Sequence, residues 1–196
     1  MRRFLNAITA FALLALGATS ALAQTQNVQP IRRATYSMVA SGITPAASAT
    51  DFVTLTGSAT KTVWVHEAGC SGTSTAAATH VIVALKRSTA NSAGTSAALT
   101  EVPHDSLSSA ATATGLSYSA NPTTGTLVGN IGAQMLSTVE AAANVANSSV
   151  VKFEFGADGW TQPVVLRGAT QVFALNGAGA SFAAGTALTC WVTWSE

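Results

Sequence analysis

The chain has 196 residues, of which 48% are hydrophobic and only 9% are charged, and its formal net charge is +1 at pH 7. So large an apolar fraction argues against a disordered chain, because disordered chains are poor in apolar residues and strongly charged. The few lysines and arginines are scattered singly or in pairs. Binding to nucleic acid needs clustered basic groups, so no nucleic-acid partner is predicted.

The first 23 residues have the three parts of a bacterial secretory signal peptide. Arg2 and Arg3 form a basic start, Phe4–Leu16 is an apolar run, and Ala21-Leu22-Ala23 is a small-x-small cleavage pattern before Gln24. The alternative is an uncleaved anchor, because about 20 mostly apolar residues can just cross a bilayer. We therefore predict an exported protein, periplasmic, secreted or at the cell surface, which meets a membrane only if the signal is retained.

Residues 24–30 are polar and predict a short tether, followed by a single domain at residues 31–196. In this domain, short apolar or alternating runs are separated by Gly, Pro, Asn and Ser, a rhythm typical of strands and turns. The predicted strands are Thr35–Ala40, Asp51–Thr56, Lys61–Glu67, His80–Arg87, Gly115–Ser119, Thr126–Gly129, Val150–Phe155, Val164–Arg167, Gln171–Leu175 and Ala187–Trp194.

Alternation within these runs indicates which side chains are buried, because residues two apart in a strand share a face. The predicted buried sets are Val151, Phe153 and Phe155 in one strand and Leu188, Cys190, Val192 and Trp194 in the last. His80–Leu85 is apolar on both faces after its first residue, as in a central strand.

Two turns are predicted from their residue types. In Asn121–Gly125, Pro122 fixes φ and Gly125 is expected to supply a positive φ. Ala157-Asp158-Gly159 is the second turn.

Residues 131–145 do not give a single prediction. Met135, Leu136, Val139, Ala142 and Ala143 fall at helical spacing. The same residues also suit a long Ala-rich loop or an irregular edge strand, so helix and non-helix both stay open.

The chain has two cysteines, Cys70 and Cys190. An even number in an exported protein predicts a disulfide that joins an early strand to the last one. The alternative is a pair of buried free thiols, which behave as small hydrophobic groups. The three histidines show no ligand spacing around either cysteine, so no metal site and no cofactor are predicted.

Two polar clusters contain residue types found in catalytic sites, and neither predicts an enzyme. His66 and Glu67 are neighbours in a predicted strand and are expected to point to opposite faces. His104-Asp105-Ser106 has the residue types of a hydrolase triad, but three adjacent side chains cannot form the relay, and a polar turn is expected after Pro103. Gly177–Ala180 resembles a phosphate-binding loop only in its glycines.

The tryptophans suggest a binding surface. Trp64 and Trp191 lie on the more polar faces of their strands, whereas Trp194 is expected in the core and Trp160 follows a turn. Two exposed indoles on one face would stack on sugar rings, or would pack beneath a subunit interface. Trp64 and Trp191 are therefore candidate ligand-facing residues.

A nearly neutral surface rich in Ala, Thr, Ser and Gly weakens repulsion between copies of a protein. With 9% charged residues, against about a quarter in an average globular domain, this chain is predicted to form a homo-oligomer or to join an assembly.

Three stretches carry a resemblance to a known group of proteins: Lys86–Thr95, Val102–Ser106 and Asn121–Gly129. Together with Gly57–Val63, Val165–Gly168 and Trp191–Trp194, they resemble the uncharacterised β-sandwich proteins found among phage and prophage structural genes. The resemblance runs from about Ala34 to Glu196, and its motifs are turns and strands rather than catalytic groups.

This resemblance implies an all-β, antiparallel, jelly-roll-like sandwich with a structural or surface-decorating role, self-assembly and no active site. The signal at residues 1–23 and the pair Cys70 and Cys190 depart from a virion protein assembled in the cytoplasm. An exported relative, a downstream start or a retained tail would each reconcile them. The predicted function is thus a non-enzymatic exported structural or surface-binding protein, and the alternative is a glycan-binding module.

Overall fold

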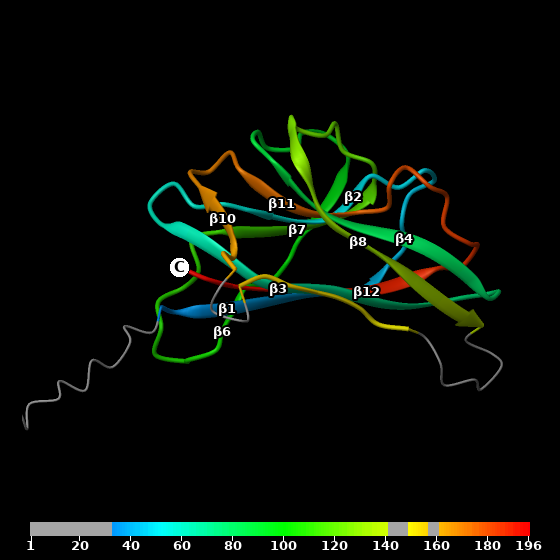
Figure 1. Ribbon diagram of the computed structural model, residues 1–196, viewed down its shortest axis with the longest axis horizontal. Coiled ribbons are helices and arrows are strands. Elements are labelled where there is room, and N and C mark those ends of the chain that lie inside the picture. Colours follow the sequence, from blue (N-terminus) through cyan, green and yellow to red (C-terminus); the bar gives the residue numbers. More distant parts are fainter. Residues whose placement is uncertain (1–32, 141–148, 157–160) are drawn as a thin grey trace, which may run out of the picture. The chain divides into compact units, whose positions relative to one another are not determined.

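The computed structural model describes residues 33–140, 149–156 and 161–196. The predicted signal and tether, the turn at 157–159 and Trp160 lie outside these residues. Within them, no helix is long and apolar enough to span a membrane. The strands are β1 (Thr35–Ile43), β2 (Asp51–Thr56), β3 (Thr62–Ser74), β4 (Ala78–Arg87), β5 (Thr95–Ala98), β6 (Val102–Pro103), β7 (Thr114–Ala120), β8 (Leu127–Glu140), β9 (Val151–Glu154), β10 (Val164–Arg167), β11 (Val172–Asn176) and β12 (Ala187–Ser195) (Figure 1).

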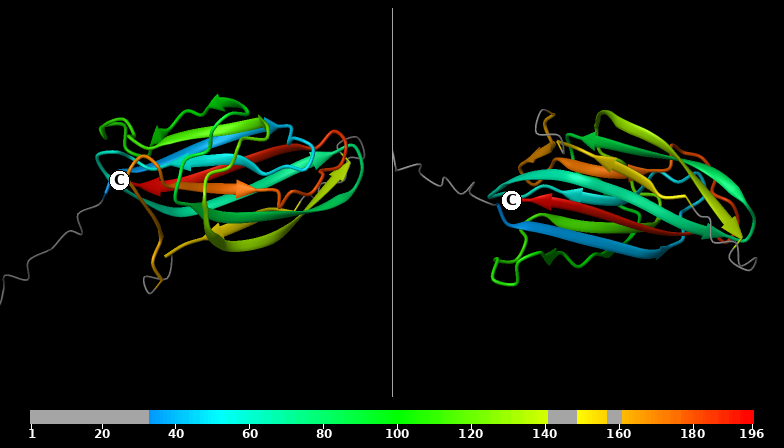
Figure 2. Two further views of the ribbon diagram at one scale, coloured as in Figure 1. Left: turned by 90° about the horizontal axis from the view of Figure 1, so that it is seen from above. Right: turned by 60° about the horizontal axis from the view of Figure 1, so that its bottom comes forward.

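The strands form two sheets that pack face to face (Figure 2). Sheet A has the order β6-β1-β12-β3, with β9 and β10 along the far edge of β3, and sheet B has the order β5-β7-β2-β11-β4-β8. The chain crosses between the sheets at each step from β1 to β4, and the last strand returns beside the first. This is the strand order of a jelly roll, and the predicted all-β antiparallel sandwich is confirmed.

The core between the sheets follows the predicted alternation. In β12, Leu188, Cys190, Val192 and Trp194 are fully buried, and Tyr36 of β1 stacks on Trp194 with 5.8 Å between ring centroids. Val151 and Phe153 of β9 are buried on the same side of sheet A, whereas Phe155, which follows the strand, is only partly buried. Ile82–Leu85 is buried on both faces. Ile82 and Ala84 belong to the main core, whereas Val83 and Leu85 form a second cluster with Val172 and Ala174.

The predicted disulfide is confirmed, and no cysteine is free. Cys70 of β3 and Cys190 of β12 are directly opposite each other in the antiparallel pair, with their Cα atoms 4.1 Å apart. Both side chains face the core and are 0% exposed. The bond therefore links two neighbouring strands that lie 120 residues apart in the chain.

The helical alternative for residues 131–145 is wrong as far as Glu140, because β8 continues to that residue. Residues 141–145 lie outside the described part of the chain. The long edge of β4 offers backbone partners from Ala78 to Arg87, and β8 pairs with it almost throughout. Near the end of β8, buried and exposed residues alternate: Leu136 and Thr138 face inward, while Met135 is 68% exposed. Pairing with β4 thus overrides the local helical spacing.

Asn121–Gly125 connects β7 to β8, and Thr123 within it forms an isolated bridge with Ser92. The role predicted for its glycine is wrong. Gly125 does not have a positive φ. Instead it passes so close to the backbone carbonyl of Thr89 that a Cβ atom would overlap that oxygen. Glycine is needed here for close approach of two loops, not for an unusual backbone angle.

Those two loops, Ser88–Gly94 and Asn121–Thr126, help to enclose a buried polar cluster next to sheet B. The carboxylate of Asp51, which is 0% exposed, accepts hydrogen bonds from Arg87 Nε at 2.6 Å and Arg87 Nη2 at 2.8 Å. It also accepts bonds from the amides of Asn91 at 2.8 Å and Asn176 at 2.7 Å. Arg87 Nη1 donates to the carbonyl of Gly125 at 2.8 Å, which ties the second loop to the sheet. We call these groups the Asp51 cluster.

A second buried carboxylate belongs to Glu196, which follows β12. The side chain of Glu196 is 0% exposed and accepts hydrogen bonds from the backbone N–H groups of Thr112 and Ala113, at 3.0 and 2.9 Å. It also accepts from the Thr112 hydroxyl at 2.6 Å and from Trp194 Nε1 at 3.2 Å, and Lys61 Nζ lies 3.3 Å away. Burial alone would raise the pKa of Glu196, but the hydrogen bonds outweigh it and lower the pKa below its usual value.

We expect Glu196→Gln to lower the free energy of unfolding at pH 7 by about 1.5–3 kcal/mol, the range for hydrogen bonds to charged groups. A depressed pKa in the folded state gives stability that is present above the unfolded pKa and is lost as pH falls through the folded pKa. The difference between wild type and variant should therefore shrink on acidification, as measured by urea unfolding at pH 7 and at acidic pH. Glu101→Gln, whose carboxylate accepts the N–H of Gly115, is the matched control. An equal difference at both pH values would contradict the prediction.

Candidate functional site

The outer face of sheet A, which points away from the core, carries polar and aromatic side chains in rows set by strand pairing. One row contains Val39 of β1, Trp191 of β12, Gly69 of β3 and Lys152 of β9. The next row contains Ser37, Thr193, Glu67 and Glu154. Residues from four separate parts of the chain thus meet on one face.

Trp191 lies across β3 at Gly69. A Cβ atom at position 69 would overlap the six-membered ring of the indole, so the ring packs directly on the strand backbone. Its Nε1–H donates to Glu67 Oε1 at 2.8 Å. The indole is partly exposed, and the contact with Gly69 and the hydrogen bond to Glu67 together fix its orientation.

Three charged groups border this ring. Lys152 Nζ lies 3.0 Å from Glu67 Oε2 and 2.6 Å from Glu154 Oε1, so it joins two carboxylates that face each other across β3 and β9. Burial tends to raise the pKa of Glu67, but the hydrogen bonds from Trp191 and Lys152 lower it overall. The hydrogen bonds to Glu154 and Glu67 raise the pKa of Lys152. We call Trp191, Gly69, Glu67, Lys152 and Glu154 the Trp191 site.

Trp64, the other candidate aromatic residue, is on the same face but outside this site. It pairs with Ser195, four residues beyond Trp191 along β12, which corresponds to about 13 Å of strand. The guanidinium of Arg33 stacks over its ring at 3.5 Å from the centroid. The two tryptophans therefore do not form one platform, and Arg33 covers a face of Trp64.

His66 and Glu67 do not point to opposite faces, so that prediction is wrong. The register between β3 and β12 shifts at this point: Thr193 pairs with Glu67 and Trp194 with Val65, which leaves His66 as the extra residue of a bulge. Both side chains are partly exposed between the buried Val65 and Ala68. His66 Nε2 is 2.8 Å from the hydroxyl of Ser195, and burial together with the charge of Arg33 lowers the pKa of His66.

The other two histidines lie elsewhere. His104 is in the bend after β6, where Asp105 Oδ1 accepts the N–H of Leu107 at 2.9 Å, so this segment is a polar turn. His80 of β4 is buried and stacks on Phe182 with ring centroids 4.4 Å apart. Its Nε2 has no hydrogen-bond partner, and burial lowers its pKa.

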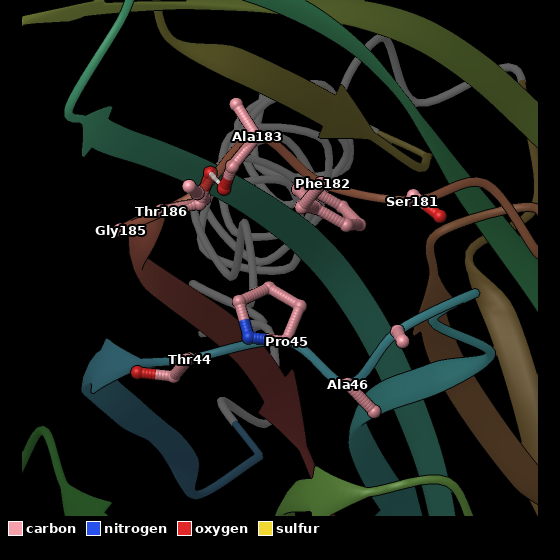
Figure 3. Close-up of a pocket in the computed structure, with 10 residues that line it drawn as sticks. Thr44, Pro45, Ala46, Ser181, Phe182, Ala183, Gly185 and Thr186 are labelled. Carbon is pink, nitrogen blue, oxygen red and sulfur yellow. Dashed lines mark hydrogen bonds between the residues drawn. The ribbon is translucent and has the colours of Figure 1, made fainter.

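Phe182 also lines a pocket of about 250 Å³ between the β1–β2 and β11–β12 connections (Figure 3). The pocket is formed by residues 44–47 and 181–186, and no ionisable side chain is among them. In the described part of the chain, no group of three or more His, Cys, Asp or Glu side chains could hold a metal ion.

A second surface feature is the edge of β8. Leu127, Val128, Ile131 and Met135 are 51%, 61%, 42% and 68% exposed. From Leu127 to Ala133, no strand among the described residues pairs with the side of β8 that faces away from β4. The other ends of the sheets are short: β5, β9 and β10 have four residues each, and β6 has two.

Sequence reasoning identified Trp191 but missed Gly69, Lys152 and Glu154. Alternation placed Lys152 and Glu154 on the polar side of β9, but the pairing of β9 with β3 joins segments about 85 residues apart and has no local signal.

The chain matches no family model, no curated protein and no solved structure.

Proposed function

We propose that this protein is a non-enzymatic, exported structural protein of phage-structural type, which works by self-association. The observation that carries the proposal is the unpaired edge of β8. Unpaired backbone N–H and C=O groups along a strand can bond to a second strand, so a long open edge is a ready site for another chain.

The composition of this edge supports pairing with a second copy. Proteins that stay monomeric commonly protect such edges with Lys or Pro, and Leu127–Ala133 contains neither. It contains no charged residue at all, so two copies meeting antiparallel about a twofold axis would place no like charges opposite each other. Val128 and Ile131 lie at register shifts of the β4–β8 pair, and their apolar side chains would be covered in the pair.

Export is supported by the signal pattern at residues 1–23 and by the Cys70–Cys190 disulfide, because disulfides persist in oxidising compartments. Cleavage after Ala23 would give a mature chain that begins at Gln24. Structural and decorating proteins commonly use jelly-roll folds, but lectins use them too, so the fold alone does not choose between these functions.

The test is the mass of the exported protein in solution, measured by light scattering after its N-terminus has been sequenced. We expect wild type to have the mass of two or more chains, unchanged on about tenfold dilution. The double variant Val128→Lys/Ile131→Lys should shift to the monomer mass, because two lysines on each edge repel and stay hydrated. Leu107→Lys is the matched control, because Leu107 is 92% exposed but lies in the loop after β6.

A monomeric wild type would refute the proposal, as would a double variant with the wild-type mass. A Leu107→Lys variant that also becomes monomeric would move the interface away from β8. A mature chain that still begins at Met1 would overturn cleavage of the signal and make residues 1–23 a retained tail.

A further inference from the structure

We propose that the Trp191 site binds a neutral oligosaccharide of β-linked pyranose rings with equatorial hydroxyls. Three observations carry this inference: the fixed orientation of the indole, its partial exposure, and the charged groups around it, which are linked by ion pairs. It does not depend on self-association through β8, because Trp191 lies on sheet A.

The indole is held ready for stacking before any ligand arrives. The six-membered ring packs on the β3 backbone at Gly69, and the indole stays partly exposed. The hydrogen bond to Glu67 satisfies the only polar group of the indole and prevents the ring from turning. An aromatic ring fixed in this way loses little conformational entropy on binding.

The ring selects the shape of the ligand. A flat aromatic surface packs well against another flat apolar surface, and its negative face attracts the weakly positive C–H groups of a sugar. A pyranose with equatorial hydroxyls has axial C–H groups on both faces, so it offers such a surface. Its hydroxyls then point sideways, in the plane of the stacked rings.

The groups beside the ring suit those hydroxyls. Glu67, Lys152 and Glu154 have side chains that are 31%, 45% and 54% exposed, so each can accept or donate a further hydrogen bond. Lys152 already bridges the two carboxylates, which leaves the three groups with a net charge of −1. A neutral ligand rich in hydroxyls fits this arrangement better than an anion, which the two carboxylates would repel.

The experiment is a titration of the exported protein with cellohexaose and with chitohexaose by isothermal calorimetry. We expect at least one hexaose to bind, and Trp191→Ala to weaken that binding about tenfold or more, as for an aromatic residue at the centre of an interface. Trp64→Ala is the matched control: Trp64 is a partly exposed tryptophan on the same face, yet Arg33 covers its ring, so the affinity should stay at the wild-type value.

Lys152→Ala and Glu154→Ala replace exposed side chains of the Trp191 site. They therefore still test binding at this site if Trp191→Ala does not fold. Each should weaken binding by a few-fold. The Val128→Lys/Ile131→Lys variant should bind with the wild-type Kd per chain, which separates this inference from the proposed function. Failure of both hexaoses to bind at millimolar concentration would overturn the inference. So would wild-type affinity in Trp191→Ala, or an equal loss in Trp64→Ala.

Discussion

Replacing Asp51 with alanine should lower the free energy of unfolding by about 3–5 kcal/mol, the range found when one partner of a buried ion pair is removed. The substitution would leave the guanidinium of Arg87, whose side chain is 7% exposed, without its counter-ion. It would also remove the acceptor of the Asn91 and Asn176 amides. Urea unfolding should show a lower midpoint with an unchanged slope.

Asp105→Ala is the matched control, because Asp105 is an exposed carboxylate that accepts a hydrogen bond from Leu107 N–H. Its effect should be much smaller than that of Asp51→Ala. Adding Arg87→Met to Asp51→Ala should recover part of the loss, because no unpaired buried charge then remains. A loss below about 1 kcal/mol for Asp51→Ala, or no recovery in the double variant, would contradict this account of the Asp51 cluster.

Removing the disulfide with Cys70→Ala/Cys190→Ala should cost about 2–5 kcal/mol. In the chain-entropy model, a closed loop of about 100 residues contributes about 4.7 kcal/mol, and these cysteines are 120 residues apart. A loss of this size lowers the Tm by about 10 °C in a domain of this length. Thermal unfolding with and without dithiothreitol measures the effect.

The same experiment contains its own control. Wild type should lose stability when dithiothreitol is present during unfolding, whereas the double variant should be insensitive to it. Mass spectrometry under non-reducing conditions should find Cys70 linked to Cys190 in wild type. Two free thiols in the purified protein would refute the bond, and equal melting of wild type and variant would refute its contribution.

Elements with a strong local pattern could be predicted from sequence. β12 and β9 alternate between apolar and polar residues, and β2 and β10 were predicted with their observed bounds. β5 and β6 were not predicted, because Thr95–Ala98 is exposed throughout and β6 has only two residues. Neither strand has an apolar face, so only pairing with β7 and β1 makes them strands.

The side-chain arrangements around Trp191 and Asp51 were less predictable, because they depend on pairing between strands far apart in the chain. The bulge at His66 brings two adjacent side chains to one face, and only the pairing with β12 reveals it. The Asp51 cluster joins residues that are 36, 40 and 125 positions apart. Nothing near Asp51 in the sequence shows that a carboxylate at the start of a strand will be buried with an arginine.

The position of β12 also sets the order in which the protein can fold. β12 ends at Ser195, yet it lies inside sheet A between β1 and β3 and pairs with both. Sheet A therefore cannot close until β12 joins β1 to β3. Closure of this sheet depends on pairing between segments 120 residues apart, which makes it a slow, long-range step of folding.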